Sequence, residues 1–192
     1  MTSFAVTVKV TTGLLVMMSA GTVTVGLEGY GRILGKEERR QRRIARGLPA
    51  EPLACLITRS GEVPTATRLF AEPEARIVVF SPTEVDLSGC AAQVEVVRLD
   101  PGELTLTTAL RRLRSDYGIR ALLCEGGPTL FGALLQEGLV DELFLTVAPK
   151  LTGGGRGPTI SSGPELADPR ELQLTWLLER NGALYLRYAV TA

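Results

Sequence analysis

The chain contains no histidine, and this absence removes several kinds of active site. Without imidazole there is no Ser–His or Cys–His nucleophile pair, no usual zinc site and no imidazole acid–base catalyst. The three cysteines, Cys55, Cys90 and Cys124, show no CxxC spacing. We therefore expect no metal-binding residues. Cys55 and Cys124 stand in apolar runs, which favours buried thiols of a reducing compartment.

The chain also lacks net charge, because 21 Lys and Arg balance 21 Asp and Glu. No overall field attracts nucleic acid or an anionic membrane. The one strongly basic run, 36–46, is free of glycine, proline and aromatic residues. It could bind a phosphorylated substrate, but with no aromatic residue to stack on bases it does not indicate a nucleic-acid site. We interpret it as a solvated helix face or arm.

A secretion signal or membrane anchor is not indicated either. The first 20 residues are fairly apolar, but their one basic residue, Lys9, falls in the middle rather than at the start. Thr11, Thr12 and Gly13 then interrupt the apolar run. We interpret this segment as strand material and expect a cytoplasmic protein that makes no membrane contact.

The 192 residues, 45% hydrophobic and 22% charged, are typical of one globular domain, and we assign residues 1–192 to it. Apolar periodicity predicts strands that alternate with helices. Helices are expected over 106–117 and 129–136, and 36–46 is a helix or an arm. Strands are expected over 4–10, 14–18, 53–58, 76–80, 94–99, 121–124 and 142–148.

Two further strands, 172–178 and 183–190, flank Asn181-Gly182, which is a strong hairpin signal. Helices alternating with strands favour an α/β fold with a mostly parallel sheet, and the hairpin adds an antiparallel edge. The hairpin is rich in leucine, tyrosine and tryptophan, and an apolar edge of this kind needs covering. We therefore expect a homodimer.

The most informative segment runs from Ala121 to Ala133, where a buried strand enters Glu125-Gly126-Gly127-Pro128-Thr129 and then a helix. Glycines let a backbone approach a ligand closely, and proline suits the first turn of a helix. The free amides of a helix start attract anions such as a pyrophosphate. A plain strand-to-helix turn is the alternative, because a glycine pair alone is a weak signal.

Residues 122–155 closely resemble the reductase domain of the bacterial riboflavin-biosynthesis deaminase/reductase, a relative of dihydrofolate reductase. The shared pattern is a strand, Glu-Gly-Gly-Pro-Thr, a helix, Gly-Leu-Val-Asp-Glu, a strand ending in Ala-Pro, and the triple glycine 153–155. The run 19–23 is similar to that family's Gly-Ala-Gly-Thr turn. The resemblance implies a dihydrofolate reductase-like fold and an NADPH-dependent reductase that acts on a phosphoribosylamino-pyrimidine, with a pterin or another heterocycle as alternative substrate.

Site residues follow from the resemblance position by position. Glu125 would act as the catalytic residue and face the substrate, together with Glu28 and Arg32. Arg59 and Ser60 would bind the adenosine 2′-phosphate, because an arginine fork with a hydroxyl suits a phosphate dianion. The other residues implied in cofactor binding are Thr22, Gly126, Gly127, Pro128, Thr129, Leu130, Phe131, Gly132 and Ala133.

The opening of the chain departs from the family, which begins with a strand, a Ser-Leu-Asp-Gly loop and a helix. Here only residues 11–13 separate the first two expected strands, and no Ser-Leu-Asp-Gly is present. The sequence therefore admits a second hypothesis, a cofactor-binding or dimerising scaffold without turnover. Fold and cofactor site alone do not decide between the two.

Overall fold

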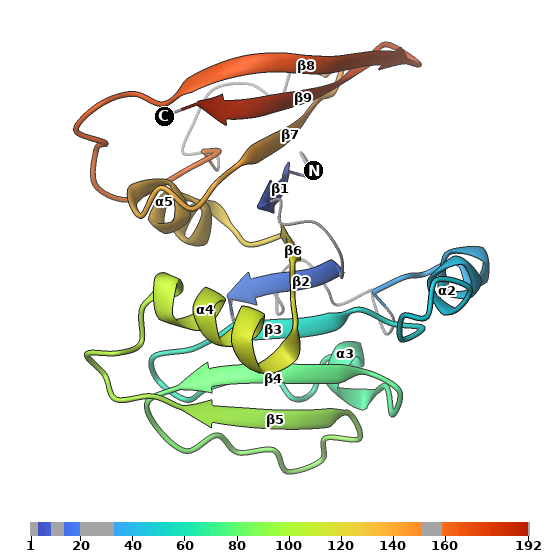
Figure 1. The fold of residues 1–192 in the computed structure, drawn as a ribbon, viewed down its shortest axis with the longest axis vertical. Coiled ribbons are helices and arrows are strands. Elements are labelled where there is room, and N and C mark those ends of the chain that lie inside the picture. The colour runs from blue at the N-terminus through green and yellow to red at the C-terminus, as the bar shows by residue number, and fades with distance from the viewer. Residues whose placement is uncertain (1–3, 9–13, 20–32, 151–158, 192) are drawn as a thin grey trace.

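The computed structural model describes residues 4–8, 14–19, 33–150 and 159–191. Within them, nine strands form one sheet, in the order β5-β4-β3-β2-β6-β1-β7-β9-β8 (Figure 1). The strands are β1 (Phe4–Val8), β2 (Leu14–Ser19), β3 (Leu53–Ile57), β4 (Arg76–Ser81), β5 (Gln93–Arg98), β6 (Ala121–Cys124), β7 (Glu142–Val147), β8 (Glu171–Arg180) and β9 (Ala183–Thr191).

The sheet has two halves that differ in strand direction. The strands β5, β4, β3, β2 and β6 are all parallel. From β6 onward, every neighbouring pair is antiparallel through β1, β7, β9 and β8. The sequence predicted an antiparallel edge made by the C-terminal hairpin. The structure extends this antiparallel part to four strands, because β1 returns to the middle of the sheet between β6 and β7.

The described part of the chain holds four helices. They are α2 (Glu37–Ile44), α3 (Arg68–Ala71), α4 (Leu106–Tyr117) and α5 (Pro128–Gln136). α4 and α5 match the helices expected over 106–117 and 129–136, and the Thr105 hydroxyl caps the start of α4 by accepting a hydrogen bond from the Thr108 amide. The short helix α3 was not expected, since four residues carry too little periodicity to predict one.

Two apolar cores lie on opposite faces of β3 and β4, because successive side chains of a strand alternate between faces. α4 and α5 cover the first core, and α3 packs against the second. The first core includes Cys55, Val78, Phe80, Leu113, Leu122 and Leu134. The second includes Ala54, Leu56, Leu69, Phe70, Ile77 and Val79. Burial on both faces explains why these strands are continuous apolar runs.

Helix α2 is not the fully solvated face that its charge predicted. Arg40 is only 8% exposed, and its guanidinium lies 2.7 Å from the Glu74 carboxylate and 3.5 Å from the carboxylate of Glu51. Glu51 is also buried and accepts a hydrogen bond from the backbone N–H of Leu34. One arginine of the basic run therefore fixes α2 to the segments that precede β3 and β4, while its neighbours stay exposed.

Candidate active site

The Glu125-Gly126-Gly127 turn lies where strand order reverses in the parallel half of the sheet. β2, β3, β4 and β5 follow one another outward, whereas β6 pairs with the other side of β2. The turn follows the carboxyl end of β6, so it opens at the edge where all five parallel strands end. In open α/β sheets, the crevice beside such a reversal is the place where ligands bind.

The start of α5 presents unpaired backbone donors at this edge. The first amide that finds a helical acceptor is that of Phe131, which donates to the Gly127 carbonyl at 3.1 Å. The amides of Thr129 and Leu130 precede it and have no acceptor among the described residues. Free N–H groups together with the partial positive charge of a helix start make a fitting cradle for a phosphate.

Gly126 is required by local packing. A Cβ at this position would lie 2.5 Å from Cδ2 of Leu130 and 2.9 Å from its Cβ. Any other residue would push the turn away from the first turn of α5. The glycine therefore keeps the strand end, the turn and the helix start tightly together, which positions the free amides.

Gly132 also has a packing reason. A glycine inside a helix lowers stability relative to alanine, so close packing or a close ligand is needed to explain it. A Cβ on Gly132 would lie 2.0 Å from the Ser162 carbonyl oxygen, so packing of backbone against α5 accounts for it. The segment 159–166, which we call the strap, crosses the helix here.

The strap is anchored along α5 by hydrogen bonds. The Ser162 amide donates to the Pro128 carbonyl at 3.1 Å, and the Gln136 amide group donates to the Pro164 carbonyl at 2.7 Å. The Ser162 hydroxyl lies 3.2 Å from that of Thr129, beside the free amides. Sequence reasoning did not single out Ser162, because its Ser-Ser-Gly-Pro surroundings indicate only a loop.

The other residues assigned to the turn divide between core and surface. The side chains of Leu130 and Phe131 are buried in the first core, so only their backbone can face a ligand. Ala133 is half-buried and Thr129 is exposed. Pro128 occupies the first helical position, as its sequence predicted.

Arg59 and Ser60 lie at the same edge, directly after β3. Both are exposed, and the Ser60 hydroxyl accepts a hydrogen bond from the Glu62 amide at 3.2 Å. β2 separates β3 from β6, so the two turns are two strand spacings apart, about 10 Å. That spacing puts the two turns at the same edge without direct contact between them.

Glu125 is half-buried at the end of β6 and forms no hydrogen bond or ion pair with any described residue. Burial raises the pKa of its carboxyl group, because the charged form loses water. An unpaired acid at the mouth of the turn is available to a ligand. The predicted site residues Thr22, Glu28 and Arg32, and the triple glycine 153–155, lie outside the described residues.

The sequence profile of the RibD C-terminal domain family matches residues 13–181. The chain belongs to this family. A 2,5-diamino-6-ribosylamino-4(3H)-pyrimidinone 5′-phosphate reductase of Archaeoglobus fulgidus is 32% identical over 154 residues, or 77% of this chain and 67% of that protein. The riboflavin biosynthesis protein RibD of Escherichia coli is 34% identical over 122 residues, or 62% of this chain and 32% of that protein.

Solved structures share the fold. A pyrimidine reductase-like protein of Corynebacterium diphtheriae superposes with a TM-score of 0.71 at 22% identity, covering 93% of this chain and 76% of that one. RibD of Acinetobacter baumannii gives the same TM-score, 0.71, at 25% identity and covers 92% of this chain but 47% of that one. The predicted dihydrofolate reductase-like α/β fold is confirmed. The chain spans only part of its bacterial RibD relatives.

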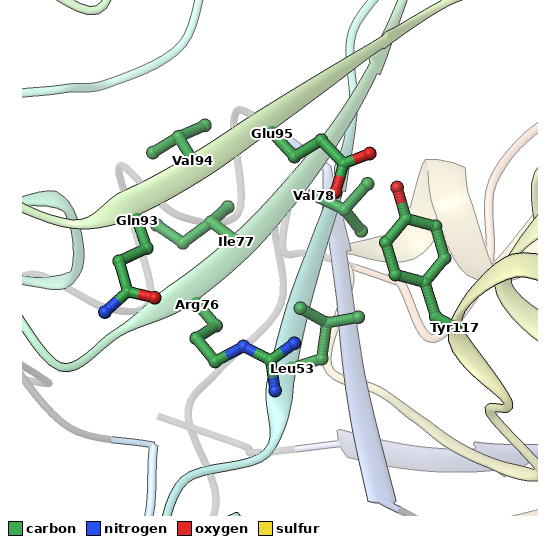
Figure 2. A pocket seen from close by; sticks show the side chains of 8 residues that line it. All are labelled: Leu53, Arg76, Ile77, Val78, Gln93, Val94, Glu95 and Tyr117. Carbon is green, nitrogen blue, oxygen red and sulfur yellow. The ribbon is translucent and has the colours of Figure 1, made fainter.

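A hollow of about 270 Å³ lies at the edge of the sheet opposite to the Glu125-Gly126-Gly127 turn. Figure 2 shows it at the amino ends of β3, β4 and β5, with the Tyr117 hydroxyl pointing toward the Glu95 carboxylate. Burial and this carboxylate raise the pKa of Tyr117. The hollow is remote from the turn and is not part of the candidate site.

The cysteines of this RibD-family chain are not positioned for catalysis. Cys55 and Cys124 are buried, as expected, and burial raises the pKa of the Cys124 thiol to about 11. A thiol of that pKa is protonated at neutral pH and is a poor nucleophile. Within the described part of the chain, no cluster of three metal-binding side chains occurs. No described helix has the length and apolarity needed to cross a bilayer.

Proposed function

We propose that the chain is an NADPH-dependent reductase of a pyrimidine that carries a ribosylamino 5′-phosphate. The observation that carries this proposal is the Gly126-Gly127-Pro128 turn at the strand-order reversal, in a chain of the RibD C-terminal family. Two relatives are named as reductases of a phosphorylated ribosylamino-pyrimidinone. Their names support the substrate class, and the turn supports a dinucleotide.

The residues at the turn fit a nicotinamide dinucleotide. The free amides of Thr129 and Leu130, with the Thr129 hydroxyl, would hold the pyrophosphate against the start of α5. In this proposal Gly126, Gly127, Phe131, Gly132 and Ala133 shape the cradle with their backbone. The core position of the Phe131 side chain and the strap contact at Gly132 keep that backbone rigid.

Arg59 and Ser60 support the choice of NADPH over NADH. Both side chains are exposed at the carboxyl edge, two strand spacings from the helix start. A guanidinium with a neighbouring hydroxyl suits the 2′-phosphate that distinguishes NADPH. Among described residues, Arg59 has no ion-pair partner that would compete with a phosphate.

Glu125 is the residue we assign to the substrate. When bound, the cofactor would supply a hydride to C1′ of the open-chain imine, which forms when the bond from C1′ to the ring oxygen breaks and the amine proton passes to that oxygen. A proton would then reach the imine nitrogen to give the ribityl product. The half-buried, unpaired carboxyl group of Glu125 can orient the amino and hydroxyl groups of the substrate. Since the chain has no histidine, the proton comes from a carboxyl group, a hydroxyl or water.

A thermal-shift titration with NADPH and NADH tests the cofactor site. We expect NADPH to raise Tm more than NADH does, and Gly127→Asp to lose the shift. The Gly127 backbone is extended (φ −69°, ψ −179°), so aspartate is tolerated there and caps the helix, while its charge repels phosphate. Gly102→Asp is the matched control, because its Cβ would meet no atom within 4 Å. Absence of a shift with both cofactors would overturn the cofactor proposal.

Turnover separates a reductase from a scaffold. NADPH absorbance should fall only when a ribosylamino-pyrimidine 5′-phosphate is added, and the 2-amino and 2-oxo forms of the ring should be assayed in parallel. A chain that binds NADPH at the turn but reduces neither form is the cofactor-binding scaffold. Glu125→Gln should retain the cofactor shift and lose turnover.

We infer a homodimer formed through the C-terminal hairpin. Every residue of β8 is exposed, and Leu172, Leu174 and Leu177 share one face with Leu184 of β9 and Val147 of β7. The exposed fractions of these five side chains run from 37% to 53%. A contiguous apolar face of this kind marks an association surface. Light scattering should give twice the mass of the chain, and L174K/L177K should give the monomer mass; a wild-type monomer at micromolar concentration would overturn the inference.

We also propose that the chain works in the cytoplasm. Cys55, Cys90 and Cys124 are all free thiols, which fits a reducing compartment. Fractionation of cells that express the tagged chain tests this location, and recovery in an oxidising compartment would contradict it.

A further inference from the structure

A second cavity opens between α4 and the amino end of β6, away from the turn. Its volume is about 330 Å³, at the lower end of the range for small-molecule sites. The lining is mainly apolar, from Leu110, Leu113, Ile119, Leu122 and Leu139. Dinucleotides are too large for this space, whereas a single ring system or a short hydrocarbon chain fits it.

Arginines surround this apolar floor. Arg111 and Arg114 extend from α4, and Arg120 stands directly before β6. All three are exposed, and none forms an ion pair with a described residue. Their neighbour Arg112, on another face of α4, does have a partner, because it pairs with Asp116 at 3.2 Å.

Acidic groups near the cavity are already engaged. Glu137 accepts hydrogen bonds from the backbone amide and the hydroxyl of Thr107, at 3.0 and 2.7 Å. Asp116 is held by Arg112 and by the Ser115 hydroxyl. Three arginines without a described ion-pair partner thus outnumber the one carboxylate, Glu137, that is not paired with a cation, so the formal charge around the cavity mouth is positive although that of the whole chain is zero.

We propose that this cavity binds a small organic anion with an apolar body, such as an aromatic carboxylate, sulfonate or phosphate. The apolar body would fill the floor made by Leu110, Leu122 and Leu139, and the anionic head would lie among the three arginines. Attraction to an unpaired guanidinium selects the anion, and burial of the ring selects against inorganic phosphate or sulfate.

The site is independent of the proposed reductase site. It lies at the amino end of β6, and the turn follows the carboxyl end, about 13 Å away along the four residues of the strand. An occupant would contact Ala121 and Leu122 of β6, the strand that ends directly before Glu125. Because the two sites are separate, binding of an anion to this cavity can be measured on the whole chain without cofactor or substrate.

Isothermal titration with naphthalene-2-sulfonate tests the proposal, with 2-naphthol as the neutral ring and sodium sulfate as the bare anion. The test variant is R111E/R114E, which reverses two surface charges and leaves the apolar floor intact. The control is R112E/R39E, which changes net charge equally but at arginines outside the cavity lining. Circular dichroism and Tm establish that both variants are folded.

We expect the wild-type chain to bind the sulfonate at least tenfold more tightly than the naphthol and not to bind sulfate measurably. R111E/R114E should weaken sulfonate binding at least tenfold, and R112E/R39E should change it less than threefold. Equal weakening by both variants would mean attraction by net charge alone and would overturn the proposal. Unchanged binding to R111E/R114E would place the probe elsewhere, at the hairpin or at the turn, and would also overturn it.

Discussion

The two halves of the sheet differ sharply in how they are buried. In the parallel half, β3 and β4 are covered on both faces, and Ala54, Leu56 and Phe80 are fully inaccessible to water. In the antiparallel half, all ten residues of β8 are exposed, Trp176 to 49%. Both halves are rich in apolar residues, so composition does not distinguish them. The difference is that β3 and β4 are covered on both faces, whereas β8 is not covered.

This contrast separates the residues that form the cores from the exposed surface that we propose for association. Helices α3, α4 and α5 pack against two cores, which hold the edge where the candidate cofactor site lies, and the first core also takes in Leu143 of β7. The outer hairpin projects beyond those helices (Figure 1). Tyr188 and Val190 of β9 still pack against the first core, whereas the apolar side chains of β8 are exposed. The candidate site therefore lies where apolar side chains are covered within the chain, and the surface that we propose for association lies where they are exposed.

The largest effect should come from the buried phenylalanine of β4. Phe80→Ala removes a fully buried ring from the first core and should lower the free energy of unfolding by about 3–5 kcal/mol. Trp176→Ala in β8 should cost less than about 1 kcal/mol at concentrations where the chain is monomeric. Urea unfolding of both variants measures the difference, and similar losses would contradict the contrast between the halves.

The next effect concerns the buried arginine of α2. Arg40→Met leaves the buried Glu51 carboxylate without its cation and should cost about 3 kcal/mol. Arg39 is exposed on the same helix, so Arg39→Met should cost less than about 0.5 kcal/mol. Chemical denaturation checks the pair. Equal losses of stability in the two variants would mean that α2 is the solvated helix that its composition predicted.

A smaller effect should appear at the strap. Gly132→Ala places a Cβ against the Ser162 carbonyl, so we expect a net loss of about 1–2 kcal/mol despite the better helix propensity of alanine. Gly102→Ala, in open space, should be neutral within about 0.5 kcal/mol. Urea unfolding of the two variants measures their free energies of unfolding. If Gly132→Ala stabilises the chain, the strap does not press on α5.

The smallest effect is a pH dependence from Glu125. Burial raises its folded-state pKa above the ordinary value of 4.5, so the unfolded chain releases its proton first as pH rises. The wild-type chain then loses stability across the window that starts near 4.5, and Glu125→Gln, which cannot ionise, avoids that loss. The two stabilities should agree well below pH 4.5 and diverge in favour of the variant above it. Parallel Tm profiles over pH measure this, and profiles that stay parallel would refute it.

Much of the fold could be predicted because its signals are local. Continuous apolar runs predicted β3, β4 and β6, and helical spacing predicted α4 and α5. The hairpin turn followed from Asn181-Gly182, whose φ angles of 54° and 76° are the left-handed conformations that this dipeptide adopts readily. The Gly-Gly-Pro-Thr turn of the candidate site could be predicted in the same way, because the backbone preferences of glycine and proline are local.

What the sequence could not supply depends on contacts between segments far apart in the chain. The antiparallel place of β1 between β6 and β7 is a choice among strand partners, which a strand's own pattern does not specify. The burial of Arg40 depends on Glu51 and Glu74, and the need for Gly132 depends on Ser162. Neighbouring residues thus determined the elements and the turn of the candidate site. Tertiary packing decided which charge is buried, which glycine is indispensable and which apolar face stays open, because each of those depends on what the fold brings against it.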